Sequence, residues 1–124
     1  MKNLNNKVAV ITGGASGLGL AMAKRFGREG MRIVLADIET ERLNTAISDL
    51  KNLGVTALGV TCDVSRGEDV ENLARRTLEH FGCVNIVCNN AGVAPSGLIW
   101  EHSTKDWEWA FGPNVWGVIH GLRV

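Results

Sequence analysis

Tyrosine is absent from this 124-residue chain, and strong charge of either sign is absent as well. Thirteen basic residues balance 13 acidic ones, so the formal net charge is zero. A neutral chain has no general attraction to polyanions, and nucleic acid is therefore not expected as a partner. Hydrophobic residues make up 45% of the sequence and charged residues 21%, which is typical of a globular domain rather than a disordered chain.

Long apolar runs are also missing. The longest run is a few residues, whereas a membrane-spanning helix needs about 20, so no membrane association is expected. The opening residues, MKNLNNK, lack the apolar stretch of a signal peptide. The cysteines at 62, 83 and 88 form no Cys-x-x-Cys pair, and the three histidines match no metal-ligand spacing. We therefore expect a cytoplasmic protein with small buried cysteines and no metal site.

Strand-like and helix-like segments alternate along the chain. Apolar runs predict strands at 7–12, 31–37, 55–63 and 84–90. Apolar residues at helical spacing predict helices over 17–29, around 43–50, and after residues 65 and 103. This order, with no linker or repeat, indicates one α/β domain over residues 1–124, built as a doubly wound parallel sheet with helices on both faces.

Apolar stripes and capping residues predict which helix faces are buried and where helices begin. The first helix should bury the face formed by Leu18, Ala21, Met22 and Phe26. Ser65 and Glu68 fit a capping box that would open the third helix.

The last predicted helix has two unusual features. Ser103 and Thr104 can cap it, and its predicted buried stripe is Trp107, Ala110, Phe111, Asn114, Val115 and Val118. A proline inside a helix removes a hydrogen bond, so we expect a kink or break at 112–113. Four tryptophans gather here, at 100, 107, 109 and 116. Core or interface packing is the expected role, and substrate stacking is the alternative.

The stretch TGGASGLG, residues 12–19, places four glycines between the first predicted strand and the first helix. A helix N-terminus there would carry free N–H groups and partial positive charge, which attract phosphate. Gly13, Gly17 and Gly19 would allow a tight turn, the close approach of a pyrophosphate, and close packing of helix on strand. The pattern favours a dinucleotide site, with a simple tight turn as the alternative.

Asp37 ends the second predicted strand, where a carboxylate can accept hydrogen bonds from both hydroxyls of an adenosine ribose. The same charge would repel a 2′-phosphate. Ile38 follows it, and the glycine stretch contains no lysine or arginine that could bind such a phosphate. Asp37 therefore predicts NAD in preference to NADP, with a solvated loop carboxylate as the alternative.

The spacing Gly-x-x-x-Gly-x-Gly after Thr12 resembles that of the short-chain dehydrogenase/reductase family. CDV at 62–64, NNAG at 89–92 and NVWG at 114–117 resemble further motifs of that family, in the family's order. The resemblance implies a Rossmann-like sheet of strand order 3-2-1-4, here cut short after the fourth strand and its following helix. The loops after strands one and four would then flank the ligand crevice.

Site residues follow from this resemblance. Asp63 would accept from the exocyclic amine of adenine, and the backbone of Val64 would meet the ring. Asn114 would be the family's catalytic asparagine, part of a proton relay, although a structural amide bonded to nearby backbone is the alternative. The resemblance assigns the cofactor contacts to Gly13, Ser16, Gly17, Leu18, Gly19, Asp37, Asp63, Val64, Asn90, Ala91 and Gly92.

The family's chemistry is hydride transfer between a nicotinamide and an alcohol or ketone, assisted by a serine and a Tyr-x-x-x-Lys pair. This chain has no tyrosine, and its last serine and lysine, Ser103 and Lys105, precede Asn114. We therefore expect the cofactor-binding part of an NAD-dependent oxidoreductase acting on secondary alcohols or ketones, homo-oligomeric in its full form and inactive as these 124 residues alone. A catalytically inert nucleotide-binding module or truncated isoform is the alternative, and an incomplete sequence is a third possibility.

Overall fold

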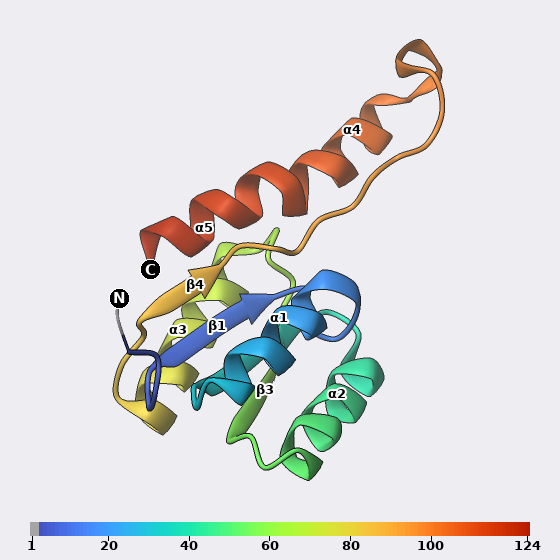
Figure 1. Ribbon diagram of the computed structural model, residues 1–124. Coiled ribbons are helices and arrows are strands. Elements are labelled where there is room, and N and C mark those ends of the chain that lie inside the picture. The colour runs from blue at the N-terminus through green and yellow to red at the C-terminus, as the bar shows by residue number, and fades with distance from the viewer. Residues whose placement is uncertain (1–2) are drawn as a thin grey trace.

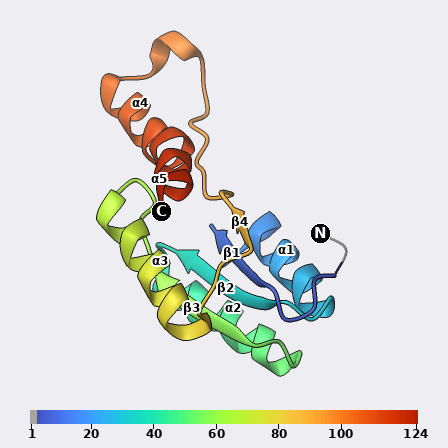
Figure 2. The same ribbon diagram turned by 90° about the vertical axis from the view of Figure 1, so that its left-hand side faces the viewer.

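The computed structural model describes residues 3–124, and these form a four-stranded parallel sheet with helices on both faces (Figures 1 and 2). The strand order is β3-β2-β1-β4. The strands are β1 (Val8–Thr12), β2 (Arg32–Asp37), β3 (Ala57–Thr61) and β4 (Ile86–Cys88). The predicted doubly wound sheet and its order 3-2-1-4 are thus confirmed.

The helices lie in two layers. On one face are α1 (Gly17–Arg28) and α2 (Thr40–Asn52), and on the other are α3 (Gly67–Phe81) and α5 (Gly117–Arg123). A π-helical turn, Gly112–Trp116, joins α5 to α4 (Thr104–Phe111), and a short 3₁₀ turn, Ile99–Glu101, precedes α4. Together α4 and α5 make one long rod, whose α4 end projects beyond the sheet (Figure 1).

Alternate residues of β1 belong to two hydrophobic clusters, one on each face of the sheet. Ala9 and Ile11 pack with α1 and α2, whereas Val8 and Val10 pack with α3. Every residue of β1 is buried, because helices cover both faces of this central strand. No helix within residues 3–124 is both long and apolar enough to cross a membrane.

All four strands are shorter than predicted, the first and second by one residue each. The third begins at Ala57 rather than at residue 55, and the fourth covers only Ile86–Cys88 of the predicted 84–90. Within the described residues β4 pairs with β1 alone. Its ladder ends where the Asn90 side chain, rather than the strand backbone, begins to bond to the end of β1.

The predicted face of α1 is half right. Met22 and Phe26 are partly buried and pack against the core. Leu18 and Ala21 are exposed, and the residues buried on α1 are Gly19 and Ala23. A Cβ on Gly19 would lie 2.2 Å from the carbonyl oxygen of Gly13, so the helix approaches the loop through this glycine. That close contact turns Leu18 outward, where it is 78% exposed.

The predicted capping box of α3 does not form. Helix α3 begins at Gly67 after Arg66, which makes no side-chain cap. The Ser65 hydroxyl instead donates to Oδ1 of Asp63 at 2.6 Å. A local turn around the carboxylate of Asp63 therefore competes with the cap and prevails.

The last helix is partly as predicted. The Ser103 cap is confirmed, because its Oγ accepts from the Asp106 N–H and its own N–H donates to the Asp106 carboxylate. The expected irregularity at 112–113 takes the form of the π-helical turn. The predicted buried stripe is wrong except at Ala110, because α4 projects past the sheet. Only Ala110 and Gly117 are buried on this rod within residues 3–124.

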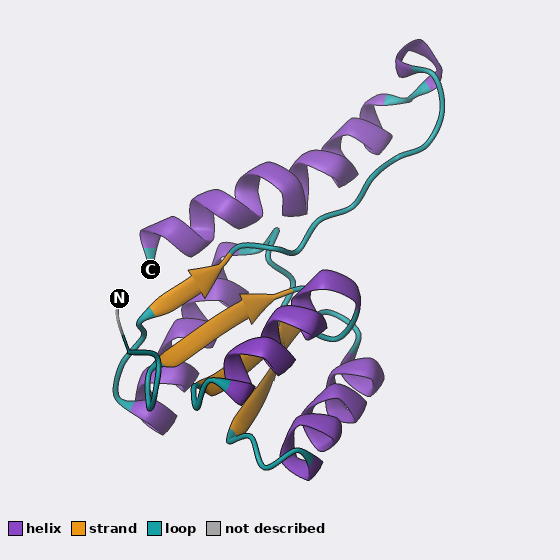
Figure 3. Cartoon of the chain, in the orientation of Figure 1, coloured by secondary structure: helices purple, strands orange, loops and turns teal. Residues whose placement is uncertain are grey.

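The cysteines differ from one another. Cys62 is buried, and burial raises the pKa of its thiol to about 12. Cys83 and Cys88 are half-buried, so the prediction that all three are buried was wrong for these two. Cys88 ends β4, and Cys83 lies in the segment between α3 and β4 (Figure 3).

Candidate cofactor-binding site

Gly13 and Gly17 have φ values of +62° and +53°, in the left-handed region that favours glycine. A Cβ on Gly13 would lie 2.9 Å from Cα of Ala91, so the backbone at Ala91 leaves room only for glycine at position 13. A Cβ on Gly17 would meet no atom within 4 Å in the described part of the chain. Gly17 therefore borders open space at the start of α1.

The N-terminus of α1 faces this same space. Ser16 is the N-cap residue, and its extended backbone makes no side-chain cap bond within the described structure. The first intrahelical bond is donated by the N–H of Leu20 to the Ser16 carbonyl. The N–H groups of the first turn thus remain available to an anion, and the exposed Ser16 and Leu18 side chains border them.

Asp37 lies beside the glycine loop at the end of β2. Its Oδ2 accepts from the N–H of Ala15 at 3.0 Å, and its Oδ1 accepts from the N–H of Glu39 at 3.1 Å. The carboxylate is half-buried and fixed by two backbone donors, which does not fit the alternative of a freely solvated loop acid. Each oxygen keeps a further lone pair for a ribose hydroxyl.

Asp63 and Val64 form the next part of the edge. The N–H of Cys62 donates to the Asp37 carbonyl at 3.0 Å, which brings this segment beside the end of β2. Oδ1 of Asp63 accepts from both the N–H and the hydroxyl of Ser65, at 3.0 and 2.6 Å. The Val64 side chain is buried.

Asn90 joins the end of β4 to the end of β1. Its side-chain amide donates to the carbonyls of Thr12 and Gly13 at 2.9 and 3.3 Å. Its backbone N–H donates to the hydroxyl of Thr12 at 3.0 Å, as does the N–H of Ala91 at 3.1 Å. Thr12 is a site-building residue that sequence reasoning missed, although a buried hydroxyl directly before a glycine loop was a usable signal.

Asn114 clamps the loop that follows β4. Its Oδ1 accepts from the N–H of Val93 at 2.8 Å, and its Nδ2 donates to the Val93 carbonyl at 2.6 Å. A Cβ on Gly92 would lie 2.8 Å from Oδ1 of Asn114, so a side chain there would displace the Asn114 amide. The side chain is exposed and bonded to nearby backbone, which is the structural alternative stated above. Its catalytic role stays a prediction.

These residues meet at one edge. The strands end there in loops, visible at the arrowheads in Figure 3. The glycine loop, Asp37, the 62–64 turn and the 90–92 segment all follow the carboxyl ends of parallel strands. Open α/β sheets bind ligands at such an edge, beside the point where the strand order reverses between β1 and β4. The cofactor positions implied by the resemblance are therefore brought to one edge of the sheet.

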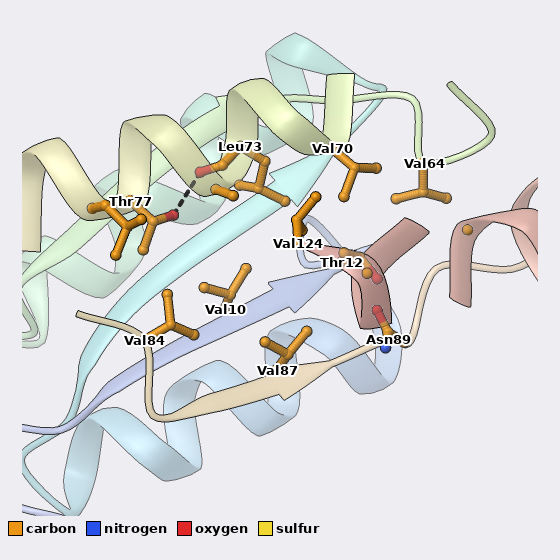
Figure 4. A pocket seen from close by; sticks show the side chains of 14 residues that line it. Val10, Thr12, Val64, Val70, Leu73, Thr77, Val84, Val87, Asn89 and Val124 are labelled. Atoms are coloured by element: carbon orange, nitrogen blue, oxygen red, sulfur yellow. Dashed lines mark hydrogen bonds between the residues drawn. The ribbon is translucent and has the colours of Figure 1, made fainter. Parts of the chain in front are cut away.

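A separate apolar cavity of about 290 Å³ lies between β1, β4, α3 and α5 (Figure 4). Val10, Val84 and Val87 line its sheet side, and Leu73 lines its α3 side. Its polar boundary includes Oδ1 of Asn89, which is buried and has no hydrogen-bond partner among the described residues. This cavity is lined mainly by valine and leucine, so it does not suit a pyrophosphate.

The sequence matches the short chain dehydrogenase family over residues 7–124. One relative is the C alpha-dehydrogenase of Sphingobium sp. (strain NBRC 103272 / SYK-6), 39% identical over 98% of this chain and 40% of its own length.

Solved structures agree with this match. A short chain dehydrogenase/reductase from Burkholderia phymatum in complex with NAD has a TM-score of 0.97 and 47% identity, covering all of this chain and 44% of that one. L-Sorbose reductase from Gluconobacter frateurii, complexed with NADPH and L-sorbose, has a TM-score of 0.92 and 36% identity over 98% of this chain and 46% of its own. The chain thus spans less than half the length of these proteins.

Proposed function

Because the chain belongs to the short-chain dehydrogenase family, we propose that it binds NAD(H) at the carboxyl edge of its sheet and prefers it to NADP(H). We propose further that residues 1–124 are a single dinucleotide-binding domain. It would serve as the cofactor-binding part of an oxidoreductase that interconverts a secondary alcohol and a ketone. A cytoplasmic location and a homo-oligomeric full-length form stay predictions.

The open space at Gly17 carries this proposal. Of the three glycines in the motif, Gly13 and Gly19 are required by neighbouring protein atoms, whereas Gly17 borders space free of described atoms. That space lies against the uncapped N-terminus of α1, where a pyrophosphate would meet N–H donors and the positive end of the helix. A side chain at position 17 would occupy the place of the phosphate.

The adenosine half has matching partners. Asp37 would accept from the ribose hydroxyls, and its negative charge disfavours a 2′-phosphate. Asp63 would accept from the adenine amine. Solved relatives hold either NAD or NADPH, so the preference rests on Asp37 and on the absence of a cation in the glycine loop.

When bound, the nicotinamide accepts or donates a hydride. This chain's own residues bind and orient the dinucleotide, and Asn114 holds the loop after β4 against the α4–α5 rod. The sequence has no tyrosine for the proton transfer. In the longer relatives, we expect the acid–base residues to lie in the part that this chain does not span.

A second candidate is a nucleotide-binding module that performs no catalysis, favoured by the absence of tyrosine. Downstream coding sequence separates the two: an in-frame Tyr-x-x-x-Lys favours the dehydrogenase, and a stop codon after Val124 favours the module. Calorimetric titration with NADH, NADPH and ADP-ribose tests the shared claim. Binding of NADH and ADP-ribose with weaker NADPH binding is expected, and failure to bind any of the three overturns the proposal.

A further inference from the structure

His120, on α5, reaches the adenine side of the proposed site. Its Nδ1 lies 3.0 Å from the carbonyl oxygen of Val64. A carbonyl oxygen can only accept, so Nδ1 must carry the hydrogen and donate it. The resemblance and the motifs gave His120 no role, yet it bonds directly to a residue of the CDV segment.

The bond from His120 is made to the Val64–Ser65 peptide group, whose N–H is also hydrogen-bonded. The carbonyl of Val64 and the N–H of Ser65 belong to one planar unit. That N–H donates to Oδ1 of Asp63 at 3.0 Å. His120 thus holds the carbonyl of the Val64–Ser65 peptide, and the N–H of the same peptide holds the carboxylate of Asp63. The orientation of the carboxylate therefore depends on the histidine.

Close packing holds the ring in place. A Cβ on Gly117 would lie 2.7 Å from Cγ2 of Val64, which shows how closely α5 approaches this turn. The ring of Trp116 stacks on that of His120 at 5.9 Å between centroids and 29° between planes. Nε2 of His120 lies 3.5 Å from where a Cβ of Gly67 would be.

We propose that His120 is a positioning residue for recognition of the adenine base. Through the Val64–Ser65 peptide it orients the carboxylate of Asp63 toward the exocyclic amine of the base. The inference rests on the proposed function and deepens it by naming what sets base selectivity. Its chemical consequence is a preference for a base that carries an amine donor at that position.

The test compares NAD with nicotinamide hypoxanthine dinucleotide, in which an oxygen replaces the adenine amine. The wild-type chain should bind NAD more tightly than this analogue. His120→Leu should weaken NAD binding by about three- to tenfold, the size expected for one hydrogen bond, and leave analogue binding nearly unchanged. His120→Asn retains a short side-chain N–H donor and should restore much of the preference for NAD.

Leu122→Ala is the matched control, because Leu122 lies on the same helix and is 77% exposed. It should leave both affinities unchanged. If His120→Leu lowers both affinities equally, or neither, the inference is wrong even though the proposed function stands. If the wild type binds neither dinucleotide nor ADP-ribose, the proposed function fails and the inference fails with it.

A measurement on the wild type keeps the inference testable if His120→Leu does not fold. Nitrogen-15 NMR of the histidine rings reports which ring nitrogen carries hydrogen. A proton on Nδ1 of His120 is expected. A neutral ring protonated on Nε2 alone would overturn the inference, because Nδ1 could not then donate to Val64.

Discussion

Thr12 and Asn90 join the ends of β1 and β4 through two hydrogen bonds. The N–H of Asn90 donates to the Thr12 hydroxyl at 3.0 Å, and the side-chain amide of Asn90 donates to the Thr12 carbonyl at 2.9 Å. The hydroxyl also accepts from the N–H of Ala91 and donates to the Cys88 carbonyl. One buried hydroxyl thus sets the spacing between the glycine loop and the segment after β4.

Thr12→Val should destabilise the chain while preserving the shape of the side chain. The substitution leaves the N–H of Ala91 without its acceptor and leaves the N–H of Asn90 with only the Cys88 carbonyl, which costs about 1–3 kcal/mol. Denaturant unfolding of both proteins measures the difference. Thr12→Ser, which keeps the hydroxyl, should lose clearly less stability. Equal stability of the valine variant and the wild type would show that the hydroxyl network contributes nothing.

Gly17→Ala should abolish dinucleotide binding with only a modest loss of stability. The alanine would adopt a left-handed φ, at a cost of about 1–2 kcal/mol, and its methyl group would enter the space proposed for the pyrophosphate. Gly54→Ala is the control, because Gly54 has φ +78° and its Cβ also meets no described atom within 4 Å. Both variants should lose similar stability, and only the first should lose NAD affinity by calorimetry. Unimpaired NAD binding by Gly17→Ala would place the pyrophosphate elsewhere.

The sequence was informative where one local signal determines the structure. The buried runs of β1 and β2, the amphipathic stripe of α2 and the Ser103 cap all depend on residues a few positions apart, and each agrees with the structure. The strand order came from the resemblance, since periodicity alone does not say which strands are neighbours.

The errors share a physical cause, which is competition between local and distant contacts. Ser65 has the spacing of a helix cap, but its hydroxyl donates a hydrogen bond to the neighbouring carboxylate of Asp63 instead. Leu18 fits an apolar stripe, but the contact of Gly19 with Gly13 sets the helix rotation. The bonds of Thr12 and His120 reach partners more than fifty residues away, so no local pattern could identify those partners.

The double variant Asp37→Ser, Ile38→Arg should shift cofactor preference toward NADP(H). Loss of the carboxylate removes repulsion of a 2′-phosphate, and serine keeps an acceptor for the N–H of Ala15. Ile38 is 62% exposed, so an arginine there costs little and can pair with the phosphate. We expect the ratio of NADPH to NADH affinity to rise at least about tenfold.

Calorimetric titration with both cofactors measures this ratio. Glu41→Ser is the matched control, since it removes a negative charge from the exposed first turn of α2 without touching the proposed ribose site. Its ratio should stay at the wild-type value. Tighter binding of NADPH than NADH by the unmodified chain would contradict the role given to Asp37.

The 124-residue chain should self-associate through its β4 side. Within residues 3–124 β4 pairs with β1 alone, and Val87 in this strand is 44% exposed beside the apolar cavity. An apolar unpaired edge favours pairing with another chain. Light scattering should show species larger than a monomer, and Val87→Lys should reduce them. Leu53→Lys adds the same charge at the end of α2 and should change little, whereas a monodisperse wild-type monomer would refute the prediction.

The 124 residues alone should not oxidise alcohols or reduce ketones at a useful rate, even with NAD bound. A positioned acid–base group contributes about 10²–10⁴-fold to such reactions, and no tyrosine is present to supply it. Lys105 is in the first turn of α4, at the projecting end of the rod, and His120 is committed to the Val64 carbonyl.

Substrate orientation is a second missing contribution, and it accounts for roughly 7–11 kcal/mol of the barrier in well-oriented systems. The test follows the absorbance of reduced nicotinamide over a panel of secondary alcohols, for this chain and for a version extended through downstream coding sequence. We expect turnover from the extended protein alone. Comparable turnover by the 124 residues would mean that an acid–base group already lies within them. His120→Asn would then be the first variant to assay, because His120 is a titratable side chain bonded to the CDV segment.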